Sequence, residues 1–342
     1  MPSGRTPPSS EAPSSGRAPS VLHVNDCAHV AETLCAEAAG RGLRWERYTP
    51  RPPGARPALT AVRRLGEVAR FRAVAEPYDL LHVHYGLMSY YAMAAGKPFT
   101  LHLHGTDIRT AIDQNQLYRQ LLLWGLRNAI RVYFSTPDLA DATRKHRPDA
   151  QWLPAAVSAA APVSGQPGPA AAQTDREARI LFCSRWDDVK GSTELRSIAV
   201  RLRDLRPALR LIGLDWGQDA AQARTVGIET LPLMPHDKFR RLLQEVDLVI
   251  GQMRCGLPGV SELEALAAGT PVVMHLTPPD PYGCRPPVID AGAESAPAAA
   301  LALLDDVSQR ARLRREGPEW VRRFHGADGI VSRLAEDYAQ VG

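Results

Sequence analysis

The sequence predicts an α/β protein built from two domains, each with a doubly wound parallel sheet, and three observations carry this prediction. A chain of 342 residues exceeds what one ordinary hydrophobic core organises, so two domains are expected. Short apolar runs alternate with segments of helical spacing, which is the pattern of parallel strands joined by crossover helices. That pattern stops and restarts around residues 156–178, a stretch dominated by Ala, Pro and Gly that is typical of an interdomain linker.

These observations divide the chain into five parts. Residues 1–20 are rich in Pro, Ser and Gly and are expected to form a disordered tail. The two sheet domains are predicted over residues 21–155 and 179–325, on either side of the linker. Residues 326–342 complete the chain with a predicted C-terminal helix.

In the first domain, apolar runs that end at turn residues predict strands, and helical spacing predicts the segments between them. The expected strands are 21–24, 43–48, 80–84, 99–102 and 131–135. The expected helices are 28–39, 59–76, 89–95, 115–128 and 139–146.

The second half repeats the alternation and then becomes helical. The expected strands are 179–183, 209–213, 228–232, 246–250 and 270–274. The expected helices are 194–205, 220–226, 237–244, 261–268, 296–304, 308–324 and 329–340.

Composition and charge exclude several classes of protein. The net charge of +4 is too small to indicate nucleic-acid binding, and no apolar run approaches the ~20 residues that a membrane-spanning helix needs. The N-terminus lacks the apolar core of a signal peptide. The five cysteines show no metal or redox spacing, and their odd number argues against a disulfide framework. We therefore expect reduced thiols in a cytoplasmic protein.

Positive charge is concentrated in residues 41–72, which hold nine arginines against two acidic residues, Glu46 and Glu67. A solvated face is the simpler interpretation, and we favour it. The alternative is a basic rim that meets an acidic acceptor or a membrane surface.

The most informative stretch runs from residue 247 to 273. An apolar strand ends at a loop that contains Gly256 and Gly259, which let backbone come close to a ligand. Ser261 is a good N-cap for the helix that follows, and Gly269 closes that helix before the next strand. Since ligands of parallel α/β sheets bind at the carboxyl ends of strands, residues 252–261 are expected to form a binding loop.

This stretch resembles the donor-binding signature of GT4-type retaining glycosyltransferases, which have the GT-B fold of two Rossmann-like domains facing a cleft. Asp247, Gly259 and the run from Glu264 to Val272 match the family pattern, but Gly256 stands where the first of two paired acids is usual. The resemblance implies a nucleotide-sugar donor site. It makes Glu264 the ligand of the ribose hydroxyls and places Gln252, Gly256 and Gly259 around the donor. In relatives, the last helix crosses back to the first domain.

Arg185 and Lys190 follow the first strand of the second domain, five residues apart on one loop, where both can face one anion. The spacing resembles the family pair that neutralises the donor diphosphate, which implies a catalytic role for both residues. Gly213 resembles a glycine turn of the family that approaches the donor. No D-x-D triplet stands at a strand end, so no metal ion is expected.

In the first domain, His104 lies in an H-G-T-D-I-R segment that resembles the family's H-G-x-D element, which implies a catalytic His that meets the donor sugar. A single histidine is more often a buried core residue, and His82 and His102 are expected to be core. Predicted acceptor contacts follow other strands: Asn25, Asp26, Tyr85, Asp107 and Arg109, with His84 beside them. For Asn25, Asp26 and Asp107, turn formation and helix capping remain equally good interpretations.

The sequence thus favours a retaining glycosyltransferase that moves a sugar from a UDP- or GDP-sugar to a hydroxyl of a small soluble acceptor, such as a natural-product intermediate. No tightly bound cofactor, nucleic acid or membrane partner is expected, and the oligomeric state is not predicted. The main alternative is a non-catalytic partner protein that binds a nucleotide sugar, which the missing acid at Gly256 motivates. A sugar-nucleotide epimerase is the third possibility.

Overall fold

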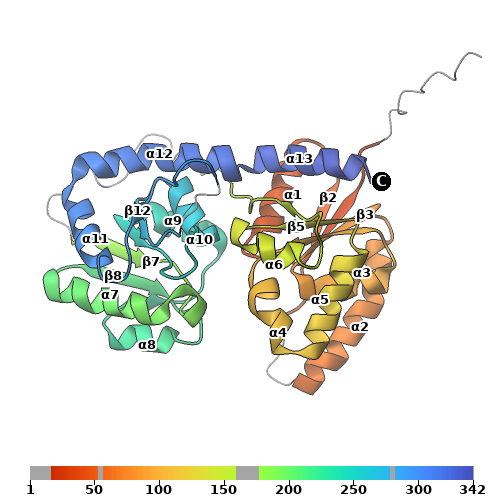
Figure 1. Ribbon diagram of the computed structural model, residues 1–342, viewed down its shortest axis with the longest axis horizontal. Coiled ribbons are helices and arrows are strands. Elements are labelled where there is room, and N and C mark those ends of the chain that lie inside the picture. Colours follow the sequence, from red (N-terminus) through yellow and green to blue (C-terminus); the bar gives the residue numbers. More distant parts are fainter. Residues whose placement is uncertain (1–16, 53–56, 159–176, 278–281, 342) are drawn as a thin grey trace, which may run out of the picture.

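A computed structural model describes residues 17–52, 57–158, 177–277 and 282–341. Most of the predicted tail and linker lie outside these residues. Figure 1 shows two lobes, each with a sheet covered by helices, and a pair of helices that runs along both of them.

The first lobe contains a sheet of six parallel strands in the order β2-β1-β3-β4-β5-β6. Its strands are β1 (Val21–Val24), β2 (Trp45–Tyr48), β3 (Leu80–His84), β4 (Phe99–Leu103), β5 (Arg131–Phe134) and β6 (Gln151–Trp152). Its main helices are α1 (Val30–Gly40), α2 (Pro57–Ala75), α3 (Ser89–Ala95), α4 (Ile112–Gln114), α5 (Gln116–Asn128) and α6 (Ala140–Arg144).

The second lobe repeats the design with a parallel sheet in the order β12-β11-β10-β7-β8-β9. Its strands are β7 (Arg179–Phe182), β8 (Arg210–Leu214), β9 (Glu229–Leu231), β10 (Leu248–Ile250), β11 (Val272–Met274) and β12 (Ile289–Asp290). Its helices are α7 (Ser192–Leu205), α8 (Ala220–Thr225), α9 (His236–Glu245), α10 (Val260–Ala267), α11 (Ala296–Asp305) and α12 (Val307–His325).

The predicted fold class is confirmed, because both halves are parallel α/β sheets and the chain alternates as expected. Two details differ. The helix after the binding loop begins at Val260 with Gly259 as its N-cap, so Ser261 lies inside the first turn. A single π-helical turn, Asp107–Ala111, replaces the loop expected after β4, and its buried Asp107 explains why the chain turns there.

The C-terminal helix α13 (Ala327–Ala339) returns to the first lobe, as Figure 1 shows. Its apolar residues Ile330, Val331 and Leu334 share a core cluster with Val30 and Leu34 of α1. Polar groups fix the same helix to the sheet, because the hydroxyl of Tyr338 lies 2.5 Å from His82 Nδ1 and that of Tyr133 donates to Asp337 at 2.7 Å. The helix therefore ties the end of the chain to the first sheet.

Several arginines of residues 41–72 form hydrogen bonds with other parts of the protein. Arg64 donates to the hydroxyl of Tyr91 at 2.7 Å and to Glu67 at 2.8 Å. Arg41 donates to the backbone carbonyl of Asp328 at 2.8 Å, which links the first lobe to α13. Among the residues described, no helix combines the length and the apolar character that crossing a membrane requires.

Candidate functional site

The loop after β7 carries the two predicted cations. Asp187 caps the 3₁₀ turn η5 (Asp188–Lys190), because its Oδ1 accepts the backbone N–H of Lys190 at 3.0 Å. Its Oδ2 accepts a hydrogen bond from Arg185, whose guanidinium carbon lies 5.6 Å from the ring centre of Trp216. Both cations are half-buried, so the loop holds two positive charges at the carboxyl edge of the second sheet.

Lys190 reaches the N-terminus of α10. A Cβ atom placed on Gly259, the N-cap residue, would lie 3.1 Å from Lys190 Nζ and 2.9 Å from Glu262 Oε2. Gly259 therefore leaves room for the ammonium beside the first turn of the helix. Unpaired N–H groups and the helix dipole favour an anion at such a turn, and the ammonium adds its full charge. The structure thus brings Lys190 and Gly259 together.

Glu262 is a buried carboxylate that the sequence did not single out. Its Oε1 accepts hydrogen bonds from Ser184 Oγ at 2.7 Å and from the backbone N–H of Gln252 at 2.9 Å. Its Oε2 accepts the backbone N–H of Gly259 at 3.0 Å. One side chain therefore fastens the loops after β7 and β10 to the helix N-terminus. The spacing from Gly259 to Glu262, that of a capping box, was the available sequence signal.

Gln252 shapes the loop after β10 from inside. Its side-chain N–H groups donate to the carbonyls of Leu257 at 3.2 Å and His275 at 3.1 Å, and its Oε1 accepts the N–H of Cys255 at 2.5 Å. The residue is fully buried. Because both the nitrogen and the oxygen of the carboxamide are hydrogen-bonded within the protein, its role in this structure is to hold the loop after β10 in shape.

At two of the predicted donor glycines, close packing leaves no room for a side chain. Gly256 has φ 72°, and a Cβ there would lie 2.1 Å from Thr277 Oγ1, so this loop conformation has no room for an acid. Gly213 lies within β8, where a Cβ would come within 2.9 Å of the Trp186 ring. The indole of Trp186 donates to the carbonyl of Leu214 at 2.9 Å, so a packed tryptophan explains the need for glycine.

Glu264 lies where the two lobes meet. Its carboxylate accepts a hydrogen bond from His236 Nε2, and this bond raises the pKa of His236 above its ordinary value. The ring of His236 stacks on that of His29 from the first lobe, with centres 4.1 Å apart and planes 5° apart. Neither histidine was predicted, because their contact depends on how the lobes are packed and not on any local motif.

Asp107 and Arg109 have partners within the first lobe. Asp107 is buried, and its two oxygens accept the backbone N–H groups of Gly86, His104, Gly105 and Ile108 at 2.9–3.2 Å. Burial raises the pKa of this carboxyl, while these hydrogen bonds act to lower it. Arg109 pairs with Asp138 at 2.6 Å. Asp107 therefore organises the turn after β4, and the predicted alternative of helix capping was wrong, because Thr106 is the N-cap and no side chain caps this helical turn.

The turn after β1 is also built from its own polar groups. Asn25 adopts φ 72° and donates from Nδ2 to the carbonyl of His84 at 3.1 Å. Asp26 accepts the backbone N–H of Ala31 at 3.0 Å and pairs with Arg47. Burial raises the pKa of Asp26, and Arg47 opposes that effect. Both side chains thus hold the turn and the start of α1.

Tyr85 follows β3 in a conformation that side chains rarely adopt, with φ 83°. The residue is half-buried, and burial raises the pKa of its hydroxyl to about 12, against an opposing effect of Arg185. Tyr85 of the first lobe therefore lies close enough to Arg185 of the second for their charges to interact. Backbone strain of this kind is characteristic of functional positions.

His104 follows β4, and its Nε2 lies 3.0 Å from His84 Nδ1. The ring is half-buried, and burial lowers its pKa to about 3, so the imidazole is neutral at physiological pH. His82 and His102 are fully buried, as predicted. His84 is fully buried too, so the expectation that it lines a pocket was wrong; it packs between other histidines of the sheet.

No family model matches the chain, and no curated protein matches it in sequence. Solved structures match over nearly the whole chain. HepE from Anabaena, in complex with UDP and glucose, aligns with a TM-score of 0.67 at 16% identity and covers 94% of this chain and 99% of its own. Sucrose-phosphate synthase from Thermosynechococcus elongatus aligns with a TM-score of 0.69 at 15% identity and covers the same shares of the two chains, 94% and 99%.

A glycosyltransferase from Rickettsia africae gives a TM-score of 0.64 at 11% identity, covering 95% of this chain and 99% of its own. At such low identity these similarities establish the architecture alone. The chain has the GT-B fold, with two Rossmann-like domains, as the sequence predicted.

Proposed function

We propose that this protein is a GT4-like retaining glycosyltransferase whose donor is a UDP- or GDP-sugar. The observation that carries the proposal is the pair of half-buried cations, Arg185 and Lys190, at the carboxyl edge of the second sheet, with Lys190 beside the N-terminus of α10. A diphosphate leaving group gains negative charge as the sugar departs. Fixed cations and helix N–H groups stabilise that charge where it develops.

In this proposal the second lobe holds the nucleotide and the first lobe holds the acceptor. Glu264 binds the ribose hydroxyls. When nucleotide binds, its carboxylate either gives up the hydrogen bond from His236 or accepts the hydroxyls in addition to it. Gln252, Gly256 and Gly259 shape the loop around the donor, while Gly213 packs behind it. Arg185 and Lys190 neutralise the diphosphate without a metal ion.

His104 is proposed to meet the donor sugar as a neutral hydrogen-bonding group, consistent with its lowered pKa. Tyr85 is a proposed acceptor contact, because its half-buried side chain follows β3 in a backbone conformation that side chains rarely adopt. Asn25 and Asp107 bond the residues on either side of it, His84 and Gly86, and they remain proposed acceptor contacts together with Asp26 and Arg109. The proposed acceptor is a small water-soluble hydroxyl compound in the cytoplasm, such as a natural-product intermediate.

The test is a mass-spectrometric screen of small-molecule acceptors with several nucleotide sugars, followed by proton NMR of the product. A transferase releases nucleoside diphosphate, and a retaining enzyme gives the anomer of the donor. Arg185→Ala and Lys190→Ala should each slow transfer by an amount that corresponds to about 2–4 kcal/mol of transition-state stabilisation. Turnover by both variants at the parent rate would refute the assignment of the diphosphate site.

The choice of a soluble acceptor has its own test. The protein should remain in the supernatant with anionic liposomes at physiological salt, since a basic rim without an apolar face gives weak, screened attraction. Sedimentation with vesicles, together with transfer to a lipid acceptor alone, would contradict it.

One observation favours a second candidate, a non-catalytic partner that binds a nucleotide sugar. The position of the usual first acid is Gly256, and Thr277 fills the space that its side chain would need. Binding of nucleotide sugar without donor hydrolysis or transfer to any acceptor would support this candidate. Recovery of an altered but intact sugar nucleotide would indicate an epimerase instead.

A further inference from the structure

Five histidines lie on one face of the first sheet. They occupy alternate positions of three neighbouring strands, with His23 in register with His82 and His84 in register with His102, and His104 follows β4. Because side chains alternate across a strand, all five point to the face that α13 covers, where Tyr338 bonds His82. A face that ordinarily holds aliphatic side chains therefore holds a layer of imidazoles.

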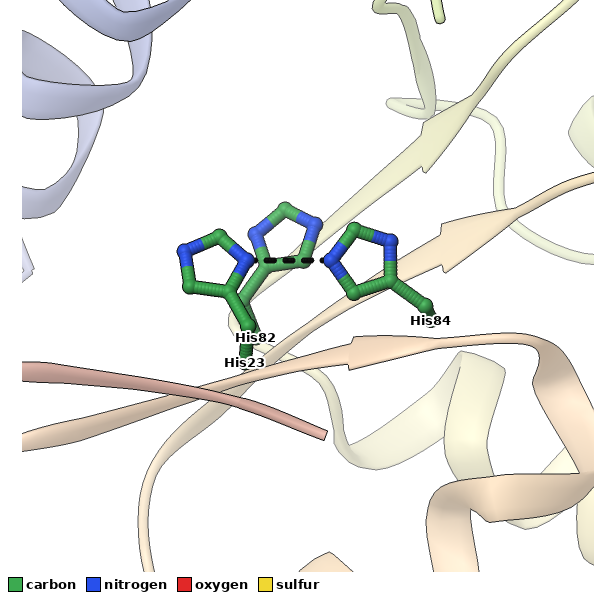
Figure 2. A group of neighbouring side chains, drawn as sticks. All are labelled: His23, His82 and His84. Atoms are coloured by element: carbon green, nitrogen blue, oxygen red, sulfur yellow. Dashed lines mark hydrogen bonds between the residues drawn. The ribbon is translucent and has the colours of Figure 1, made fainter. Parts of the chain in front are cut away.

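Three of these rings form one hydrogen-bonded chain. His23 Nδ1 lies 3.0 Å from His84 Nε2, and His84 Nδ1 lies 3.0 Å from His104 Nε2. Figure 2 shows the first of these bonds, with the ring of His82 beside it. The chain crosses the sheet from β1 through β3 to the residue after β4.

The two ends of the chain differ. At the inner end, His23 Nε2 is buried and has no hydrogen-bond partner within the described part of the protein. At the outer end, His104 is half-buried, and its Nδ1 has no partner among the described residues either. Burial lowers the pKa of His23 and of His104 to about 3 and that of His84 well below its ordinary value, so the three rings are neutral at pH 7.

Neutral imidazoles impose a strict rule on such a chain. Each ring carries one N–H, and each 3.0 Å contact needs one donor and one acceptor. If His84 donates from Nδ1, then His23 must also carry its proton on Nδ1, and so must His104. If His84 donates from Nε2, all three protons move to Nε2. Any mixed arrangement places two N–H groups or two lone pairs against each other in the interior.

We infer that His23 and His84 are positioning residues that lock the tautomer of His104, so that His104 offers its ligand one fixed hydrogen-bonding role. Only the identity of that ligand, the donor sugar, rests on the proposed function. The lock has a physical basis, because the buried end at His23 cannot exchange its proton with water. Without this constraint, His104 could change tautomer, and its Nδ1 could either donate to or accept from a ligand group.

The other two histidines form a separate pair that serves as an internal reference. His102 Nε2 lies 3.2 Å from the carbonyl of Leu153, which can only accept, so His102 carries Nε2–H. Its Nδ1 then accepts from His82 Nε2 at 3.4 Å. His82 Nδ1 in turn accepts from Tyr338 and from Thr100 Oγ1, at 3.0 Å for the latter. The expected tautomer of both rings is therefore Nε2–H.

A metal site is the competing interpretation, since His23, His82 and His84 bring ring nitrogens within 4.8 Å of one another. Their orientation opposes it. His23 Nδ1 and His84 Nε2 face each other at 3.0 Å in hydrogen-bonding geometry, so their in-plane lone-pair directions lie along the line between the two nitrogens. A tetrahedral ion needs the lone pairs of its ligands to converge on a point outside that line.

The test is long-range proton–nitrogen NMR of ¹⁵N-histidine protein, in which protonated and unprotonated ring nitrogens resonate far apart. We expect one shared tautomer for His23, His84 and His104, Nε2–H for His82 and His102, and no titration of the three between pH 7.5 and 6. A mixed pattern among the three, or titration of His104 in that range, would overturn the inference. So would a stoichiometric shift of these signals on adding Zn²⁺.

Two matched variants test the hydrogen-bonded chain of histidines: one breaks it and the other leaves it intact. His84→Leu removes the middle link, and His104 should then populate both tautomers, with transfer slowed about tenfold. His82→Leu makes the same substitution on the same strand and face, leaves both contacts of the chain in place, and should keep the His104 spectrum of the parent. An unchanged His104 spectrum in His84→Leu would refute the lock. If that variant does not fold, the parent spectrum decides, and it does so even if no transfer activity is found.

Discussion

The two lobes share one architecture but treat the carboxyl edges of their sheets in opposite ways. In the first lobe, buried neutral histidines and the buried Asp107 build the edge, and both Asp107 and His84 have hydrogen-bond partners within the lobe. In the second lobe, the loop after β7 holds Arg185 and Lys190 half-buried, with Lys190 beside the N-terminus of α10. The first edge is packed around uncharged imidazoles and paired side chains, while the second carries two half-buried cations on one loop, of which Arg185 pairs with Asp187.

Under the proposed function, this difference would divide the work of sugar transfer between the two lobes. Charge that must meet a diphosphate needs partial exposure, because full burial would require permanent partners. A group that must present a neutral hydrogen bond needs burial, because burial is what lowers the pKa of His104. The predictions below test the two edges separately.

The largest expected effect is on the first lobe at acid pH. Burial holds the pKa of each histidine in the layer below its unfolded value, so the unfolded chain binds more protons once the pH falls below about 6.5. Stability is therefore complete above that pH and is lost as the pH decreases, by about 1.4 kcal/mol per pH unit for each such ring. Chemical unfolding at pH 7.5, 6.5 and 5.5 measures it. A free energy of unfolding that is flat over this range would show that the rings are not buried in neutral form.

In the second lobe, Glu262→Ala should have the next largest effect. It leaves Ser184, Gln252 and Gly259 without their common acceptor, which should cost about 3 kcal/mol of stability. Urea denaturation measures this loss. The matched control is Glu264→Ala on the same helix, which removes a carboxylate with one described partner, His236. An equal loss of unfolding free energy in the two variants would contradict the inference that Glu262 fastens both loops to the helix.

Gly256→Ala tests the loop after β10. An alanine there must adopt φ 72° and displace Thr277, at a cost of about 2 kcal/mol. Gly292→Ala is the control, because a Cβ at that glycine meets nothing within 4 Å. Thermal unfolding compares them. If Gly256→Ala is as stable as the control, the loop can reshape, and the absence of an acid would need another explanation.

The smallest expected effect concerns the contact between the lobes. The stacked rings of His29 and His236 should contribute about 0.5–1 kcal/mol of coupling, as paired aromatic rings do. A double-mutant cycle with His29→Ala and His236→Ala measures that coupling through the free energy of unfolding. A coupling of zero would mean that the lobes do not hold this contact in solution.

The fold was largely predictable because its signals are local. Apolar runs, helical spacing and glycine punctuation gave nearly every strand and helix of both lobes, with end points that differ by a few residues. The short strands β6 and β12 span two residues each and carry too little pattern to be detected. The N-cap at Gly259 was assigned to Ser261 because side-chain capping is the stronger sequence signal.

The candidate site was less predictable because much of it depends on contacts between distant segments. Glu262 reaches Ser184 across 78 positions of sequence, and His29 meets His236 only through the packing of the lobes. The histidine chain did leave a trace, since His82 and His84 alternate along β3, and His102 and His104 alternate along β4 and the residue after it. That trace becomes a connected chain only once the strand register is known.

The central claim is that the charged edge of the second lobe binds the diphosphate of a nucleotide. Isothermal titration of UDP and GDP into the parent, Arg185→Ala and Lys190→Ala tests it most directly, because it needs neither the sugar nor the acceptor. We predict that at least one nucleoside diphosphate binds the parent and that each variant binds it at least about tenfold more weakly, which corresponds to about 1.4 kcal/mol. Binding of equal strength in all three proteins, or no binding of either nucleotide to the parent, would contradict the account.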